Sequence, residues 1–253
     1  MEGYRMENIE YIVLPEADST NTWCREHASG LALPTVVRAV AQSAGRGQRG
    51  NSWESAPGQN LTFSIVWHPE GLAPADQFSI SEATALGVVD YLSRHGIEAK
   101  VKWPNDIYVG DRKICGILIE HSLMGSSLER SVIGVGINVN QKEFISDAPN
   151  PVSMCQLARK EFDLDEELGA VISEIAPLLE AVSSAAGREA LHKKFLANLW
   201  RGDGGIYLFR DVKENCRFAG VIEGVEPSGF LLVKDNETGN LKKYAFKEVE
   251  FIL

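Results

Sequence analysis

A segment rich in glycine and arginine is the part of this sequence whose residue types are best suited to binding an anion. Residues 33–53 contain no acidic side chain, and they include Arg38, Arg46 and Arg49, the last two within the hexapeptide GRGQRG at residues 45–50. Glycines let backbone N–H groups approach an anion closely, and guanidinium groups donate charge-assisted hydrogen bonds to phosphate or carboxylate. The spacing matches neither a P-loop nor a dinucleotide-binding fingerprint. The segment predicts a local anion site, and the alternative is a flexible, solvated loop.

Three further side chains are candidates for the same site. Trp53 follows the loop and could stack on a heterocycle, although a tryptophan in this position is more often part of the core. In the turn KWPND at residues 102–106, Asn105 stands beside a cation and a carboxylate; the alternative is a hairpin corner whose side chains bond their own backbone. Asn138 lies among β-branched residues in GVGINVN at residues 134–140, where a bound base could satisfy a buried amide. The alternative there is a strand bulged at its glycines.

Lys113 opens a run, residues 114–120, that has few polar side chains and therefore predicts a strand buried centrally in a sheet. Strict alternation along this strand would place Lys113 on the same face as Cys115, Ile117 and Ile119. Its ammonium group then either reaches past the sheet end to water or points at a ligand.

Composition limits the classes of protein that remain. A chain of 253 residues with 44% hydrophobic and 24% charged residues can form a large domain and a small one. Its net charge of -10 argues against a protein whose main task is to bind polyanions. The four cysteines and five histidines lack metal-ligand spacing, which predicts reduced thiols, a cytoplasmic location and no side-chain metal site. No membrane-spanning run or signal-peptide core is present.

Hydrophobic periodicity predicts an α+β fold in which a mixed, largely antiparallel sheet is flanked by helices. Strands are expected at residues 9–14, 36–40, 61–67, 100–103, 107–109, 114–120 and 131–139. Helices are expected after capping residues 18–21, at 78–92, after a capping box formed by Ser153 and Gln156, and at 164–175, with Pro177 interrupting the last helix or starting another. Short runs at 206–209, 217–225, 230–234 and 241–246 predict a small β-barrel. The expected domains are residues 1–202 and 203–253.

The order and the residue identities of these motifs resemble those of biotin protein ligases. The motifs are, in chain order, DSTN at 18–21, Gln42 followed by GRGQRG and Trp53, KWPND, RKICGILIE at 112–120 and GVGINVN. The resemblance covers essentially the whole chain, including an SH3-like β domain at the C-terminal end. It implies an enzyme that activates biotin with ATP to biotinyl-5'-AMP and transfers the biotinyl group to a lysine of a biotin carboxyl carrier domain. It also implies Mg²⁺, held largely by nucleotide oxygens.

The resemblance implies roles for individual residues. Those implied in binding biotin are Ser19, Thr20, Gln42, Gly45, Arg46, Lys113 and Gly116. Those implied in binding ATP or the adenylate are Arg46, Arg49, Trp53, Asn105 and Asn138. Lys113 and Arg46 are the implied catalytic residues, because cations are needed to offset the repulsion between a carboxylate and a triphosphate. This chemistry requires no side-chain nucleophile.

Gln48 departs from the family pattern, which usually has arginine there. Glutamine keeps a hydrogen-bonding amide without the charge, so we expect Arg49 to retain the adenylate in its place. Repressor members of the family carry a DNA-binding domain before the catalytic domain, whereas the first strand is expected here at about Ile9, and no specific DNA binding is therefore expected. By analogy with the family a homodimer is possible, with residues 134–140 as an edge strand that pairs across a two-fold axis.

Two other functions stay open at the level of sequence. A lipoate or octanoate protein ligase has a similar fold, but its glycine-triplet motif followed by His-Asp is lacking here. A non-catalytic biotin-binding sensor would not need Lys113 beside the arginine loop. Biotin-dependent exchange of labelled pyrophosphate into ATP distinguishes these functions.

Overall fold

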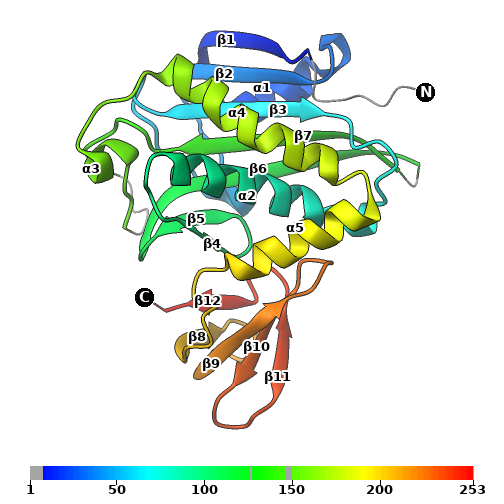
Figure 1. Cartoon of the computed structure of the whole chain (residues 1–253), viewed down its shortest axis with the longest axis vertical. Helices are drawn as coiled ribbons and strands as arrows, with labels where there is room; N and C mark the ends of the chain where they lie inside the picture. Colours follow the sequence, from blue (N-terminus) through cyan, green and yellow to red (C-terminus); the bar gives the residue numbers. More distant parts are fainter. Residues whose placement is uncertain (1–7, 126, 146–149, 253) are drawn as a thin grey trace.

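The computed structural model describes residues 8–125, 127–145 and 150–252, which form a large sheet surrounded by helices and a smaller C-terminal sheet (Figure 1). The large sheet has the order β1-β2-β3-β7-β6-β5-β4, in which β1 and β2 are parallel and all other neighbours are antiparallel. Its strands are β1 (Glu10–Ala17), β2 (Thr35–Gln42), β3 (Leu61–Trp67), β4 (Lys100–Lys102), β5 (Asp106–Val109), β6 (Arg112–Met124) and β7 (Ser127–Ile137). The predicted mixed, largely antiparallel sheet is confirmed.

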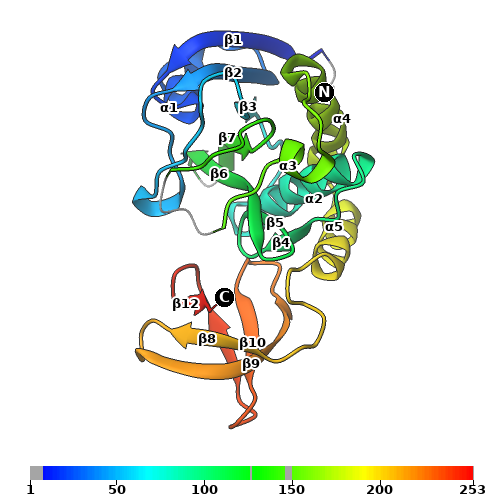
Figure 2. The same cartoon turned by 90° about the vertical axis from the view of Figure 1, so that its left-hand side faces the viewer.

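Helices lie on both faces of this sheet, as the two views show (Figures 1 and 2). The helices are α1 (Thr20–Glu26), α2 (Phe78–Arg94), α3 (Met154–Ala158), α4 (Leu164–Ala181) and α5 (Ala185–Ala197), with short 3₁₀ turns η1 (Ala28–Gly30), η2 (Gln48–Gly50) and η3 (Pro74–Asp76). Helix α1 packs against β2, β3 and β7 on one face, while α2 covers the other and packs in turn against α4 and α5. The α1 face, with its single short helix, leaves room for a site.

Strand β3 illustrates how the sequence distinguishes the two faces. Every side chain of this strand is buried. Phe63 and Ile65 belong to the core shared with α2, whereas Val66 packs with Cys24 of α1. Because side chains alternate along a strand, Ser64 also points to the α1 face, where it finds hydrogen-bond partners. A polar residue in an apolar strand therefore marks the face that carries the site.

Helix α4 continues through Pro177 to Ala181, so the prediction that Pro177 breaks this helix is wrong. Proline removes one backbone hydrogen bond near the end of the helix. Close packing outweighs that loss: a Cβ added to Gly87 of α2 would lie 2.8 Å from the Cα of Ile175, and Leu179, beyond the proline, is fully buried. Helix α3 begins with the predicted capping box of Ser153 and Gln156, whereas α5 was not anticipated.

Strand β7 lies in the middle of the sheet, hydrogen-bonded to β3 on one side and to β6 on the other. The prediction that residues 134–140 form an edge strand able to pair across a two-fold axis is therefore wrong. Both edges of this strand are already used by neighbours within the chain.

The smaller sheet is antiparallel, with the order β11-β10-β9-β8-β12. Its strands are β8 (Tyr207–Asp211), β9 (Cys216–Val225), β10 (Leu231–Asp235), β11 (Leu241–Tyr244) and β12 (Val249–Phe251). The sequence predicted four of them; β12, with three residues, is too short for periodicity to reveal. The indole N–H of Trp103 donates to the carbonyl of Gly229 at 2.9 Å, which ties the two sheets together. Within the described ranges, no helix is both long and apolar enough to cross a bilayer.

Candidate functional site

A cavity of about 1160 Å³ opens on the α1 face of the large sheet and extends to the C-terminal sheet. Nine of the eleven side chains implicated from the sequence line it: Ser19, Thr20, Gln42, Arg46, Trp53, Asn105, Lys113, Gly116 and Asn138. They come from widely separated segments of the chain, so the fold brings together most of the predicted site.

Two facing glycines form the floor of the cavity beneath Trp53. Gly116 of β6 and Gly136 of β7 are paired across the ladder without a bulge. A Cβ on Gly136 would lie 2.4 Å from Cε2 and 2.6 Å from Nε1 of Trp53, and one on Gly116 would lie 3.0 Å from Cζ3. The indole thus rests on bare backbone, and the glycines serve close approach rather than a bulged strand. The buried indole nitrogen has no hydrogen-bond partner among the described residues.

Hydroxyl and amide groups gather at the end of the cavity beside α1. The backbone N–H of Thr20 donates to Oε1 of Gln42 at 2.8 Å. Ser64 Oγ lies 2.7 Å from Thr20 Oγ1 and 2.6 Å from Asn21 Oδ1. Because the amide oxygen only accepts, Ser64 donates to Asn21 and accepts from Thr20, and the lone pairs of Thr20 stay available to a donor on a ligand. This end suits a polar, uncharged head group.

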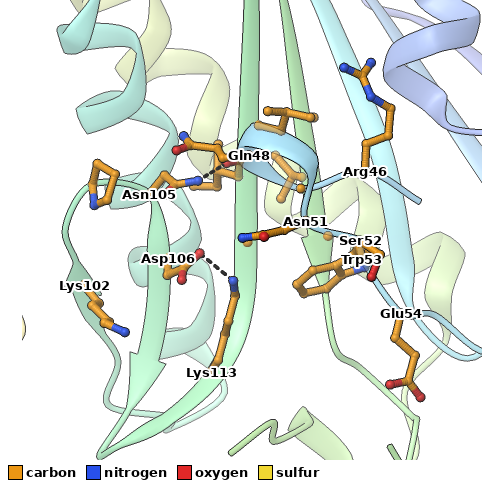
Figure 3. A pocket seen from close by; sticks show the side chains of 18 of the residues that line it. Arg46, Gln48, Asn51, Ser52, Trp53, Glu54, Lys102, Asn105, Asp106 and Lys113 are labelled. Carbon is orange, nitrogen blue, oxygen red and sulfur yellow. Dashed lines mark hydrogen bonds and ion pairs between the residues drawn. The ribbon is translucent and has the colours of Figure 1, made fainter. Parts of the chain in front are cut away.

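Two cations that line the cavity are each paired with a carboxylate. Arg46 Nη2 lies 3.1 Å from Glu120 Oε1. Lys113 Nζ lies 2.7 Å from Asp106 Oδ1 (Figure 3). Lys113 Nζ also lies 5.7 Å from the centre of the Trp53 ring. The 33–53 segment has no acidic residue of its own, but Glu120 of β6 supplies a carboxylate that pairs with Arg46.

Arg38, the third arginine of that segment, is not part of this site. Its side chain is 7% exposed and pairs with Asp165 at the start of α4, on the other side of the sheet. The anion site expected in the 33–53 segment therefore does not include Arg38.

Lys113 shares a face with Gly116, so the face predicted from alternation is wrong. Tyr108 pairs with Lys113 but Ile107 pairs with Cys115, which leaves Ile114 as an extra residue in β6. Such a bulge turns the side chains on one side of it to the opposite face. Lys113 Cε consequently lies 3.4 Å from the position of a Cβ on Gly116. Cys115 points into the α2 core, where burial raises the pKa of its thiol and keeps it protonated.

Asparagine amides line the end of the cavity away from α1. Asn105 donates from Nδ2 to the carbonyl of Ile117, which excludes a turn that satisfies only its own backbone. Asn138, 3% exposed, donates from Nδ2 to the carbonyl of Val152 at 3.1 Å. Its Oδ1 is buried and has no partner within the described part of the chain. An unsatisfied buried acceptor is costly, so this atom suits an N–H donor on a ligand.

Gly45 and Arg49 differ from the other predicted residues. Gly45 lines a smaller cavity beside Arg46 and Glu120, and a Cβ on it would lie 2.4 Å from the carbonyl oxygen of Trp53. Its role is therefore to let the chain pass close to Trp53. Arg49 belongs to η2, and the prediction about its side chain lies outside what the structure describes. Gln48, beside it, lines the main cavity.

The C-terminal sheet forms one wall of the cavity, which sequence analysis missed. The residues it contributes are Val212, Phe246, Lys247, Val249, Glu250 and Phe251. Close to this wall, Lys102 donates to the hydroxyl of Tyr108 at 2.9 Å and lies over the ring of Phe251. Burial lowers the pKa of Lys102, and the nearby Asp106 carboxylate opposes part of that change. No motif predicts these contacts, because they depend on how the second sheet docks.

No cluster of three or more His, Cys, Asp or Glu side chains able to hold a metal ion occurs in the ranges that the structure describes. Mg²⁺ commonly binds through one or two carboxylates and the oxygens of a substrate phosphate, keeping several waters. The Asp106 carboxylate at the cavity wall fits that mode of binding.

Comparison with known proteins identifies the family to which this chain belongs. The model of the biotin/lipoate A/B protein ligase family matches residues 13–138. A biotin–[acetyl-CoA-carboxylase] ligase of Paracoccus denitrificans is 30% identical over 229 residues, covering 88% of this chain and 93% of that protein. The chain belongs to the biotin protein ligase family. Its longer relatives include the bifunctional ligase/repressor BirA of Escherichia coli K12, which is 38% identical over 128 residues covering 50% of this chain.

The matched part of the chain spans less than half the length of two ligase/repressors, 40% for the Escherichia coli protein and 46% for that of Salmonella typhimurium. Among solved structures, a biotin protein ligase from Aquifex aeolicus in complex with biotin and ATP aligns with a TM-score of 0.79 at 24% identity. The alignment covers 95% of this chain and 97% of that one. At this identity the likeness concerns the fold, and it includes the C-terminal sheet.

Proposed function

We propose that this protein activates biotin with ATP and transfers the biotinyl group to a lysine of a biotin carboxyl carrier domain. In the first step, the carboxylate of biotin attacks the α-phosphate of ATP, which gives biotinyl-5'-AMP and releases pyrophosphate. In the second, the neutral amine of the acceptor lysine attacks the acyl carbon, an amide forms and AMP leaves. The observation that carries the proposal is that one cavity brings Lys113 together with the hydroxyl groups of Ser19 and Thr20 and with the buried amide of Asn138.

Each end of the cavity has groups that can bind one of the two substrates. The ureido group of biotin has the donors and acceptors that Ser19, Thr20 and Gln42 complement, and its apolar rings can pack beside Trp53, which covers the glycine floor. The adenine amino group can donate to the free Oδ1 of Asn138.

The cations of the site act where the two anions meet. Arg46 and Lys113 reduce the repulsion between carboxylate and triphosphate and stabilise the charge that develops at the α-phosphate. Bound substrates would displace water from the cavity and so strengthen these charge interactions. Mg²⁺ would neutralise the phosphates of the nucleotide, with Asp106 as the carboxylate that could hold it. The Cys115 thiol, protonated and turned away, takes no part.

The organisation of the chain is part of the same proposal. Residues 1–202 form the catalytic domain and residues 203–253 a C-terminal domain whose edge strand β12, with the segment before it, lines the cavity. All four cysteines are free thiols, which supports the cytoplasm as the compartment. The acceptor is a biotin carboxyl carrier protein or domain.

The direct test is incubation with ATP, Mg²⁺, biotin and a carrier domain, followed by mass measurement of the acceptor. One biotinyl group per acceptor is expected. Exchange of labelled pyrophosphate into ATP that depends on lipoate instead of biotin would favour a lipoyl ligase, and binding of biotin without any exchange would favour a sensor.

A further inference from the structure

A charged side chain joins the two loops that enclose the cavity. Glu54 directly follows Trp53, and its Oε1 accepts from the backbone N–H of Ile145 at 3.0 Å and from Nε2 of Gln141 at 3.0 Å. Its Oε2 lies 3.2 Å from the same backbone N–H of Ile145. In Figure 3 the Glu54 side chain extends away from Lys113, on the far side of Trp53. Glu54 therefore reaches across to the segment that follows β7.

Gln141 fixes the geometry of this connection, because both its amide oxygen and its amide nitrogen are engaged in hydrogen bonds. The residue is 3% exposed. Its Oε1 accepts from Asn60 Nδ2 at 2.6 Å and from the backbone N–H of Ala56 at 2.9 Å. Its Nε2 donates to Glu54 and to the backbone carbonyl of Glu143 at 2.8 Å. A buried amide with every donor and acceptor engaged admits one arrangement of its neighbours.

The network joins two segments that both line the cavity: the one that ends in Trp53 and Glu54, and the one that follows β7. Trp53, before Glu54, covers the glycine floor. Asn138 and Phe144, in the segment before Ile145, line the same cavity. Hydrogen bonds to a carboxylate are about twice as strong as those between neutral groups. The Glu54 carboxylate thus holds the Trp53 wall and the Phe144 wall in register.

We propose that Glu54 is a positioning residue that couples occupation of the two ends of the cavity. The inference rests on the proposed function, which places biotin beside Gln42, at the start of the segment that leads to Trp53 and Glu54, and the adenine of the nucleotide beside Asn138. A ligand that orders one wall also orders the other through Glu54 and Gln141, so the second ligand binds to a wall that is already in place. Glu54 is itself part of the cavity lining, and it acts through its hydrogen bonds to Gln141 and Ile145.

The test is a thermodynamic cycle measured by calorimetry. The dissociation constant of biotin is measured with and without α,β-methylene-ATP, an analogue that is not cleaved at the reacting bond. In the unaltered protein we expect the analogue to tighten biotin binding by roughly 10-fold, within the usual range for coupled sites. In Glu54→Ala the effect should fall to less than about 2-fold, while biotin alone binds within about 3-fold of its original affinity.

Two variants distinguish positioning from loss of structure. Glu54→Gln keeps an oxygen that can accept from Ile145, so it should retain part of the coupling. Glu143→Gln makes the same change of charge on an exposed side chain two residues after Gln141, and Glu143 meets the network only through its backbone carbonyl; it should couple like the unaltered protein.

The outcomes separate the inference from the proposed function. Full coupling in Glu54→Ala would overturn the role of Glu54, as would an unaltered protein that binds both ligands independently. Equal weakening of each ligand alone, with the coupling retained, would also overturn it. Failure of the unaltered protein to bind biotin or the analogue would instead overturn the proposed function.

Discussion

Replacement of Gly136 by alanine tests the claim that the cavity depends on bare backbone beneath Trp53. Gly136 lies in β7 with ordinary strand geometry, so alanine can adopt its backbone conformation. The new methyl group would lie 2.4, 2.6 and 2.8 Å from three atoms of the indole. Carbon atoms in contact are normally about 3.5–4.0 Å apart, so the indole must retreat by about 1 Å.

A displacement of this size in a group that positions substrate can lower a rate about 100-fold. We therefore expect biotin-dependent pyrophosphate exchange to fall by about two orders of magnitude in Gly136→Ala. The free energy of unfolding, measured in urea, should fall by no more than the roughly 1–3 kcal/mol typical of overpacking. Gly169→Ala in α4, where a Cβ meets nothing within 4 Å, should leave exchange unchanged.

A double variant isolates the cause. If the methyl group acts only by displacing the indole, Gly136→Ala should have little further effect in a Trp53→Ala background. A loss of exchange that is equally large in both backgrounds would refute the reasoning, because it would show that the methyl group obstructs the ligand directly. Unchanged exchange in the single variant would refute it as well.

Three other substitutions test separate parts of the structure. Lys113→Ala should reduce adenylation by at least about 100-fold with the fold retained, since the ammonium group faces the cavity rather than the core; normal exchange would contradict its role. Arg49→Ala should release biotinyl-5'-AMP and label bystander lysines, and unchanged specificity by mass spectrometry would argue against Arg49 replacing the missing arginine at Gln48. Burial raises the pKa of Glu82 to about 7, and His192, whose Nδ1 lies 2.6 Å from Glu82 Oε1, opposes part of that rise. Because the folded pKa lies above the ordinary value of 4.5, the unfolded chain releases this proton first, and stability decreases as pH rises from about 4.5 to 7. Glu82→Gln should remove that decrease, by up to about 3 kcal/mol, in urea unfolding at pH 5 and pH 8; identical pH dependence in the two proteins would contradict the assignment.

Most elements of the large sheet were predictable because their signals are local. Residues 61–67 are apolar or β-branched except for Ser64, and β3 has those bounds. The box formed by Ser153 and Gln156 begins α3 as expected, since both partners lie within one turn. Pro177 shows the limit of such reasoning, because packing of α4 against α2 overrides a local preference.

In the candidate site, too, some features were predictable from sequence and others were not. The ordered motifs were sufficient to select nine residues that line one cavity, since short motifs carry residue type and spacing. The face of Lys113 was not predictable, because a single bulge in β6 reverses the alternation on which the prediction relied. The counter-charges of Arg46 and Lys113 depend on strand pairing, which brings Glu120 and Asp106 into range.

The sequence by itself determined the chemistry available to this protein: it has a glycine-arginine loop, a lysine at a strand end, two asparagine amides and an indole, and their motifs follow one another as in biotin protein ligases. Only the tertiary structure decided which of these groups face one another, that Arg38 lies outside the site, that the C-terminal sheet closes the cavity and that Glu54 joins its two walls. The physical reason is the distance along the chain over which each kind of interaction acts. Residue type and capping act over a few positions, whereas register, bulges and the docking of one sheet on another depend on contacts between segments far apart in the chain.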